Sequence, residues 1–110
     1  MGEVVQPTLR VEYEQTAQEH LITLIGEMDM ANVDEVRAPV MRSMDSADGK
    51  PVIVDMSELS FIDSSGIRLL LEAQAASNAD SNRLSIRGVG EGVSQVLRMT
   101  GLDERLNLID

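Results

Sequence analysis

Hydrophobic and polar positions follow two different periods along the chain, and the period changes several times. In residues 8–14, TLRVEYE, hydrophobic and polar positions alternate, as in a half-buried strand. Residues 20–29, HLITLIGEMD, form a second strand-like run, which we expect to stop at Gly26. The short link QTAQE between the two runs suits a hairpin, so the pattern predicts two neighbouring strands here.

From Asp29 the hydrophobic period lengthens to three or four residues, as on one face of a helix. The positions with this period are Val33, Val36, Val40 and Met44. Asp29 or Asn32 can cap the start of this helix. Pro39 conflicts with a helix interior, because it lacks a backbone donor and crowds the preceding turn. We therefore expect a kink or a split near Ala38.

Strands and helices continue to alternate in the second half of the chain. Residues 51–56, PVIVDM, are almost continuously hydrophobic, as in a buried parallel strand. A helical period follows two serines, and we expect its leucines to pack on the sheet. Its positions are Ile67, Leu70, Leu71 and Gln74. Residues 83–88 and 105–109 read as two more strands, and residues 91–101 as a third helix that Gly101 closes.

This alternation predicts an α/β fold in which helices pack against a mixed, mostly parallel sheet of four to five strands. The length of 110 residues, with 43% hydrophobic, suits one compact domain with a real core. We expect a single domain over residues 1–110, with an ordered core over about residues 9–109.

The net charge of −10 limits the classes of partner. Nucleic acid and anionic membrane surfaces would on average repel such a chain, so we expect neither as a partner and consider a basic protein surface more suitable. The first residues show no signal-peptide pattern, and no window has the length and hydrophobicity of a membrane span. We therefore expect a cytoplasmic protein.

Few residues are available for catalysis. The chain has no cysteine, and its only histidine, His20, stands at the start of a strand, where we expect it to be solvated. A Ser-His-Asp site would need His20 beside Ser64, and Ser64 lacks the Gly-x-Ser-x-Gly motif. Acidic residues are scattered without calcium-loop spacing. We therefore predict neither an enzyme nor a bound metal.

Nucleotide sites are also disfavoured. The only lysine, Lys50, is followed by proline, so the DGKP stretch is not a P-loop. The GVGEGV stretch lacks the full dinucleotide-binding spacing and reads as a turn that opens the third helix. A receiver domain would need an acidic pair after the first strand and a lysine after a late strand. Here the first strand ends without such a pair and Lys50 lies before the central strand, so Asp55 is a poor phosphoaspartate candidate. We predict no cofactor.

The stretch DSSG, residues 63–66, has two readings. Ser and Asp are favoured N-cap residues, so these side chains can simply begin a helix. Alternatively, a hydroxyl here is a modification site, because a helix N-terminus suits added negative charge and Gly66 keeps the surface low. Local chemistry leaves both readings open.

Three stretches in order resemble the STAS domain family, and specifically the bacterial anti-sigma-factor antagonists. The central stretch is VIVDMSELSFIDSSGIRLLLEA; it is flanked by LITLIGEMDMANVDEVR and VSQVLRMTGLDERLNLI. The resemblance covers about residues 9–109 and implies a STAS-type single domain. Pro39 departs from the pattern expected in the family's first helix.

The resemblance implies a protein switch. An unphosphorylated antagonist binds an anti-sigma factor that is itself a serine kinase and holds the ATP, and so releases a sigma factor for transcription in stress or sporulation signalling. Phosphorylation of the first serine of the motif, here Ser64, releases the antagonist, and a PP2C-type phosphatase restores it.

The resemblance also implies a partner surface around Ser64. It comprises Asp29, Asp63, Ser65, Gly66 and Arg68, of which Asp29 matches an acidic position near the acceptor, and Arg68 a variable position that influences partner choice. An alternative is a STAS module that is never phosphorylated and serves as a scaffold or ligand-sensing domain in a larger signalling assembly. The sequence is also compatible with a homodimer.

Overall fold

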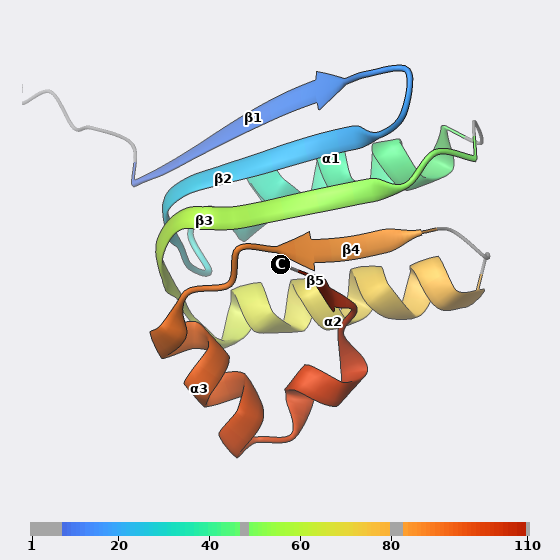
Figure 1. Ribbon diagram of the computed structural model, residues 1–110. Helices are drawn as coiled ribbons and strands as arrows, with labels where there is room; N and C mark the ends of the chain where they lie inside the picture. Colours follow the sequence, from blue (N-terminus) through green and yellow to red (C-terminus); the bar gives the residue numbers. More distant parts are fainter. Residues whose placement is uncertain (1–7, 47–48, 80–82, 110) are drawn as a thin grey trace, which may run out of the picture.

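The computed structural model describes residues 8–46, 49–79 and 83–109, which form one α/β layer structure. Its elements in chain order are β1 (Leu9–Gln15), β2 (His20–Met28), α1 (Val33–Asp45), β3 (Val52–Ile62), α2 (Ser64–Ala79), β4 (Leu84–Arg87), α3 (Glu91–Met99), the short 3-10 helix η1 (Leu102–Arg105) and β5 (Leu108–Ile109). Helices α1 and α2 lie against one side of the sheet (Figure 1).

The strands lie in the sheet in the same order as in the chain, β1-β2-β3-β4-β5. The first pair is antiparallel and the three later pairs are parallel. The predicted hairpin and the predicted mixed, mostly parallel sheet of four to five strands are thus confirmed, and the sheet has five strands. In the hairpin, Gly26 has φ +105°, and a Cβ there would lie 2.2 Å from the backbone oxygen of Thr8. Only glycine allows β1 and β2 to approach so closely at this point.

Strands β2 and β3 are longer than their hydrophobic runs. β2 continues past Gly26 to Met28, and β3 continues past Met56 to Ile62. Their parallel register shifts between Gly26 and Glu27, as at a bulge. The polar residues of these extensions stay in the sheet because they pair with the neighbouring strand. Hydrophobic periodicity along the sequence does not predict such pairing.

Helix α1 runs without interruption through Pro39, so of the kink or split expected near Ala38 the split does not occur. The hydrophobic face on both sides of the proline is buried, with Val36 at 0% and Val40 at 2% exposure. Burial of this face offsets the hydrogen bond that proline cannot make. Asn32 occupies the N-cap position, but its side chain makes no capping bond to the helix.

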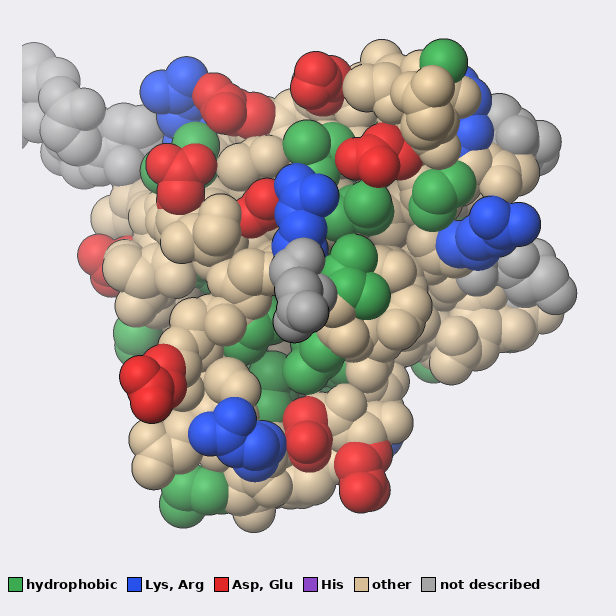
Figure 2. Space-filling model, in the orientation of Figure 1, with side chains coloured by type: hydrophobic (Ala, Val, Ile, Leu, Met, Phe, Trp, Pro, Cys, Tyr) green, Lys and Arg blue, Asp and Glu red, His purple; other side chains and the backbone are tan. Residues whose placement is uncertain are grey.

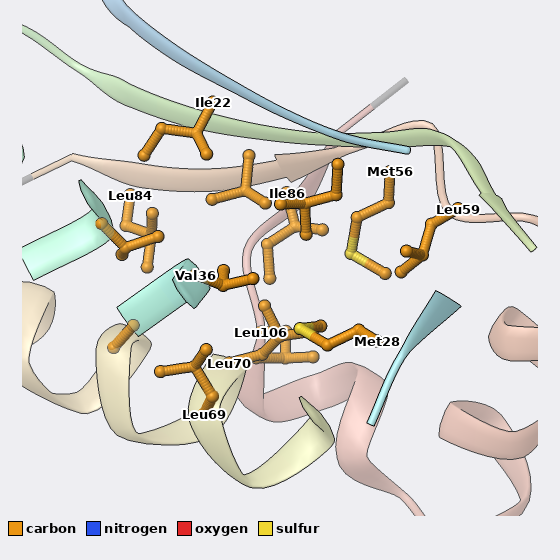
Figure 3. Packing of buried hydrophobic residues seen from close by; sticks show 14 of the residues in the cluster. Ile22, Met28, Val36, Met56, Leu59, Leu69, Leu70, Leu84, Ile86 and Leu106 are labelled. Atoms are coloured by element: carbon orange, nitrogen blue, oxygen red, sulfur yellow. The ribbon is translucent and has the colours of Figure 1, made fainter. Parts of the chain in front are cut away.

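The core lies between the sheet and helices α1 and α2 (Figure 3). Its hydrophobic cluster consists of aliphatic side chains and methionines. The labelled side chains are Ile22, Met28, Val36, Met56, Leu59, Leu69, Leu70, Leu84, Ile86 and Leu106. In α2 the buried face includes Leu70 and Gln74, as predicted, and also Leu69. Gln74 is satisfied because its side-chain oxygen accepts a hydrogen bond from the backbone N–H of Asn107 (2.9 Å).

His20 is buried, so the expectation of a solvated histidine is wrong. Its exposure is 1%, because it shares the core-facing side of β2 with Ile22 and Leu24. Its Nδ1 lies 2.7 Å from the Tyr13 hydroxyl and its Nε2 lies 3.2 Å from the Ser46 hydroxyl. The ring therefore links β1, β2 and the end of α1.

The C-terminal segment returns to the sheet through two short helices. The turn before Glu91 opens α3, as predicted, and Gly101 adopts a left-handed conformation just after the helix. The 3-10 helix that follows was not predicted, and the final strand consists of Leu108 and Ile109 alone.

On the side of the sheet turned away from α1 and α2, hydrophobic side chains are interspersed with charged ones (Figure 2). Strand alternation places Leu21, Ile25 and Ile53 there, outside the main core. Asp55 and Arg87 pair across β3 and β4 on the same side (2.9 Å).

Candidate partner-binding site at the start of helix α2

The candidate site lies where β3 ends and α2 begins, beside the turn between β2 and α1. Asp63 stands between β3 and α2, and its backbone N–H donates to the carbonyl of Met28, the last residue of β2 (3.1 Å). The carboxyl ends of the two parallel strands are therefore tied together at this point. The turn and the helix start form one surface.

The Asp63 carboxylate organises this surface. One of its oxygens accepts hydrogen bonds from the backbone N–H groups of Ser65 (2.8 Å) and Gly66 (3.2 Å). The other accepts from the backbone N–H of Met30 (3.1 Å). Asp63 is thus the N-cap of α2 and also fixes the β2–α1 turn. This observation decides which side chain of the DSSG stretch caps the helix.

The two serines differ in their surroundings. Ser64 is exposed, and within the described part of the chain its hydroxyl makes no hydrogen bond. Ser65 is half-buried in the first turn of the helix. Because Asp63 already caps the helix, the Ser64 hydroxyl is available at the surface.

Asp29 lies in the neighbouring turn and is half-buried. Its carboxylate accepts from the backbone N–H of Ala31 (2.9 Å), and its own N–H donates to the Asn32 side chain (2.9 Å). Asn32 donates in turn to the Glu27 carbonyl (2.9 Å). The turn is therefore held in one conformation, and the carboxylates of Asp29 and Asp63 both accept from its backbone N–H groups, those of Ala31 and Met30.

Gly66 and Arg68 have different positions relative to the surface. Gly66 is buried, and a Cβ there would lie 2.6 Å from Ile62 Cγ1 and 2.9 Å from Met28 Cε. Its missing side chain therefore allows α2 to pack closely on the ends of β2 and β3. Arg68 is exposed, in the second turn of α2.

Hydrophobic side chains also belong to this surface, and the sequence prediction did not include them. Met30 is 80% exposed, Phe61 49% and Val96 48%. A hollow of about 240 Å³ lies between the end of β3, the start of α2 and α3; its lining residues are Ser60, Phe61, Ile62, Ile67, Gly92, Val93 and Val96. The adjacent pair Phe61 and Ile62 at a strand end was the available signal, since neighbouring strand residues face opposite sides.

Other candidate chemistry lies elsewhere or is committed to the fold. His20 begins β2 and pairs with the start of β3, whereas Ser64 follows the far end of β3, so about 30 Å of strand separates His20 from Ser64.

Asp55 accepts hydrogen bonds from Ser57 and Arg87. Although burial alone would raise the Asp55 pKa, these hydrogen bonds and the Arg87 charge lower it. In the described ranges no group of three or more His, Asp or Glu residues could hold a metal ion.

Comparison with known proteins identifies the family. The family model described as Mlab, STAS domain matches residues 11–110. The chain therefore belongs to the STAS domain family, which confirms the resemblance found in its three motifs. Among the described helices, none has both the length and the hydrophobicity to cross a membrane.

Similar proteins include named regulators of sigma factors. An anti-sigma F factor antagonist of Paenibacillus polymyxa is 24% identical over 102 residues, covering 93% of this chain and 87% of the relative. The structure of the anti-sigma factor antagonist SpoIIAA in its unphosphorylated form has a TM-score of 0.75 and 26% identity, over 92% of this chain and 87% of that one. The structure of the Bacillus cell fate determinant SpoIIAA in its phosphorylated form has a TM-score of 0.72 and 25% identity, over 92% of this chain and 90% of that one.

Proposed function

We propose that the chain is an anti-sigma-factor antagonist controlled by phosphorylation of Ser64. Its unphosphorylated form binds an anti-sigma factor, which is also a serine kinase, and thereby releases a sigma factor for transcription. The kinase holds the ATP and phosphorylates Ser64, and a PP2C-type phosphatase removes the phosphate. Membership of the STAS family and similarity to named antagonists support this role.

The observation that carries the proposal is the exposed Ser64 hydroxyl beside a helix start that Asp63 caps. Because the cap does not use Ser64, a kinase can modify this hydroxyl without removing a bond on which the fold depends. The chain supplies the acceptor, and the partner supplies the nucleotide.

The electrostatic surroundings explain why the phosphate would act on the complex. A phosphoserine adds roughly −1.5 to −2 charges at neutral pH. The N–H groups of Ser65 and Gly66 already donate to Asp63, so they are not open to the phosphate. The new charge would instead add to those of Asp29 and Asp63 and face the partner. A loss of about 3 kcal/mol of binding free energy lowers affinity roughly a hundredfold, which is enough for a switch.

The contact surface extends from the acidic turns to the hydrophobic hollow. Asp29, Asp63, Ser65 and Arg68 supply its polar part, with the Gly66 backbone beneath them. Phe61 and Val96 supply hydrophobic area of the kind that dominates binding energy at interfaces.

The first experiment tests the acceptor. The Ser64→Ala protein serves as bait in an extract of the native cells, and the captured kinase is purified and incubated with ATP and each variant. Mass spectrometry should find one phosphoryl group on Ser64 in the wild type and in Ser65→Ala, and none in Ser64→Ala. A phosphate on Ser65, or one that persists in Ser64→Ala, contradicts the assignment. Stable binding without phosphorylation favours the scaffold alternative.

The second experiment tests the effect of charge. Ser64→Asp should weaken binding to the captured partner about tenfold or more, while its free energy of unfolding changes little, because negative charge at a helix N-terminus is tolerated. Ala17→Asp is the matched control, since it adds the same charge in the exposed β1–β2 turn at the other end of the sheet. Unfolding of Ser64→Asp would show that Ser64 is structural.

A further inference from the structure

Strand β1 is an edge strand, with no neighbour on its outer side within the described residues (Figure 1). The Thr8 carbonyl accepts from the Glu27 N–H at the start of the β1–β2 ladder (2.7 Å). In an antiparallel ladder, alternate residues bond to the partner strand and the others point their backbone groups away from it. Arg10, Glu12 and Glu14 therefore bond to β2, and the N–H and C=O groups of the intervening residues point outward.

The intervening residues are Leu9, Val11 and Tyr13, and their side chains face the helices. Leu9 is buried, Val11 is half-buried and Tyr13 is 49% exposed. The outer edge of the sheet thus combines unpaired backbone groups with a partly exposed hydrophobic strip. The opposite edge is β5, which has only two residues and offers no comparable surface.

This edge is complementary to itself. If two copies of β1 pair antiparallel with Val11 opposite Val11, Leu9 lies opposite Tyr13. Each of these pairs has outward-pointing N–H and C=O groups and can exchange two backbone hydrogen bonds. On the other face, Arg10 of each copy then lies opposite Glu12 of the other. In the single chain Arg10 and Glu12 already pair with each other (2.6 Å), so the dimer forms a cluster of alternating charges.

Charge selects this register over its neighbours. A shift that places Val11 opposite Tyr13 puts Glu12 opposite Glu12, and a shift that places Leu9 opposite Val11 puts Arg10 opposite Arg10. Like charges directly opposite each other destabilise a strand pair. Edge strands commonly use charge to prevent pairing, but the register with Val11 opposite Val11 places no like charges opposite each other, whereas both neighbouring registers do.

We propose that two copies of the chain associate through their β1 edges, with Val11 at the two-fold axis, and join their sheets into one. This inference is independent of the role of Ser64, which follows β3 and lies two strands away from this edge. A single strand pair buries little area, so we expect a reversible dimer with a dissociation constant on the order of 1–100 µM.

A charge exchange tests the pairing. Sedimentation velocity across a concentration series measures self-association of the full chain, with circular dichroism to confirm folding. Arg10→Glu and Glu12→Arg should each weaken association about tenfold or more, and the double variant should restore it to within about threefold of the wild type. Glu14→Arg is the control and should change association little, because Glu14 faces the uncharged Thr8 in the proposed register. In the register with Val11 opposite Tyr13, Glu14 would instead face Arg10, and the same substitution would weaken association.

A covalent test is available because the chain has no cysteine. Opposite residues of a bonded pair have Cα atoms about 5.5 Å apart, within disulfide range, so oxidised Val11→Cys should form a covalent dimer. Glu12→Cys should not, because Glu12 faces Arg10. A wild type that stays monomeric at about 1 mM, single charge variants without effect, or a double variant that does not recover would each overturn the proposal.

Discussion

At the scale of single residues, Asp63 determines the geometry of the candidate site. Its carboxylate accepts from the N–H groups of Met30, Ser65 and Gly66, and so joins a turn and a helix that are 33 residues apart in sequence. The DSSG stretch alone predicted a cap but not which side chain provides it. The bond from the Met30 N–H to the same carboxylate is a tertiary contact, which local sequence does not locate.

Replacement of Asp63 should therefore destabilise the domain. Asp63→Ala should lower the free energy of unfolding by about 1–3 kcal/mol, since it removes the cap and leaves the Met30 N–H without its partner. Asp63→Asn should cost less than Asp63→Ala, because its one amide oxygen can still accept from the N–H groups of Ser65 and Gly66, although its NH2 group cannot replace the acceptor for Met30. Urea denaturation measures both, with Ser64→Ala as the control that should change stability little. Equal effects of Asp63→Ala and Ser64→Ala would contradict this account of the cap.

Asp55 gives a prediction of pH dependence. Its pKa is lowered in the folded state, although burial opposes this, because Ser57 and Arg87 hydrogen-bond to the charged form. A lowered folded pKa means that the stabilisation is present above the unfolded value of about 3.9 and is lost as the pH falls through the folded value.

Asp55→Asn should consequently be less stable than the wild type at pH 7, and the difference should shrink below about pH 4. Urea denaturation at a series of pH values measures it. Asp45→Asn, at an exposed position at the end of α1, serves as control. If the stability difference between the wild type and Asp55→Asn grew as the pH fell, the Asp55 pKa would not be lowered in the folded state.

His20 shows how a residue-scale prediction failed although the signal was present. The polarity of its side chain suggested that His20 is exposed to solvent. However, His20 lies two and four residues before Ile22 and Leu24, so strand alternation places all three on the core-facing side of β2. The position is polar yet buried because Tyr13 and Ser46 meet both ring nitrogens. These partners come from two other elements, so periodicity predicts the direction of the side chain but not its hydrogen bonds.

At the scale of elements, hydrophobic periodicity located the helices and strands but not their ends. Strand β3 continues past its hydrophobic run because Glu58, Leu59, Phe61 and Ile62 pair with β2. That pairing is a tertiary property. The predicted partner surface therefore lacked Phe61, because Phe61 lies in the part of β3 that the hydrophobic pattern did not predict.

Helix α1 keeps its proline at a cost in stability. Pro39 lies in the helix interior, where it cannot donate the hydrogen bond that other residues make. Pro39→Ala should raise the free energy of unfolding by about 1–2 kcal/mol, less than the full helix penalty because proline also restricts the unfolded chain. Thermal unfolding measures this, with Ala38→Gly as a control that should lower stability. A lower melting temperature for Pro39→Ala would mean that packing of the ring outweighs the missing bond.

At the scale of the whole molecule, charge acts against compactness. The chain carries 19 acidic and 9 basic residues, and only a few of its acidic groups have basic partners among the described residues. The α1–α2 contact includes one such pair, between Arg37 and Glu72. Repulsion among the remaining acidic groups disfavours the folded state at low ionic strength.

Salt should therefore stabilise the domain. Raising sodium chloride from about 20 mM to about 500 mM shortens the Debye length and should increase the melting temperature by a few degrees. Differential scanning calorimetry measures the shift. Potassium chloride at the same concentration is the control, since a screening effect should not depend on the cation. A fall in melting temperature would show that attractive pairs dominate the surface.

The order of the strands in the sheet has a consequence for how the chain folds. Every strand lies beside the strand that precedes it in sequence, so each can find its partner already present as the chain leaves the ribosome. No strand must wait for a later one to be inserted between two earlier ones. The β1–β2 hairpin closes over only four linking residues, Thr16 to Glu19, and can serve as the first template. Synthesis from the N-terminus would then add β3, β4 and β5 successively to one growing edge.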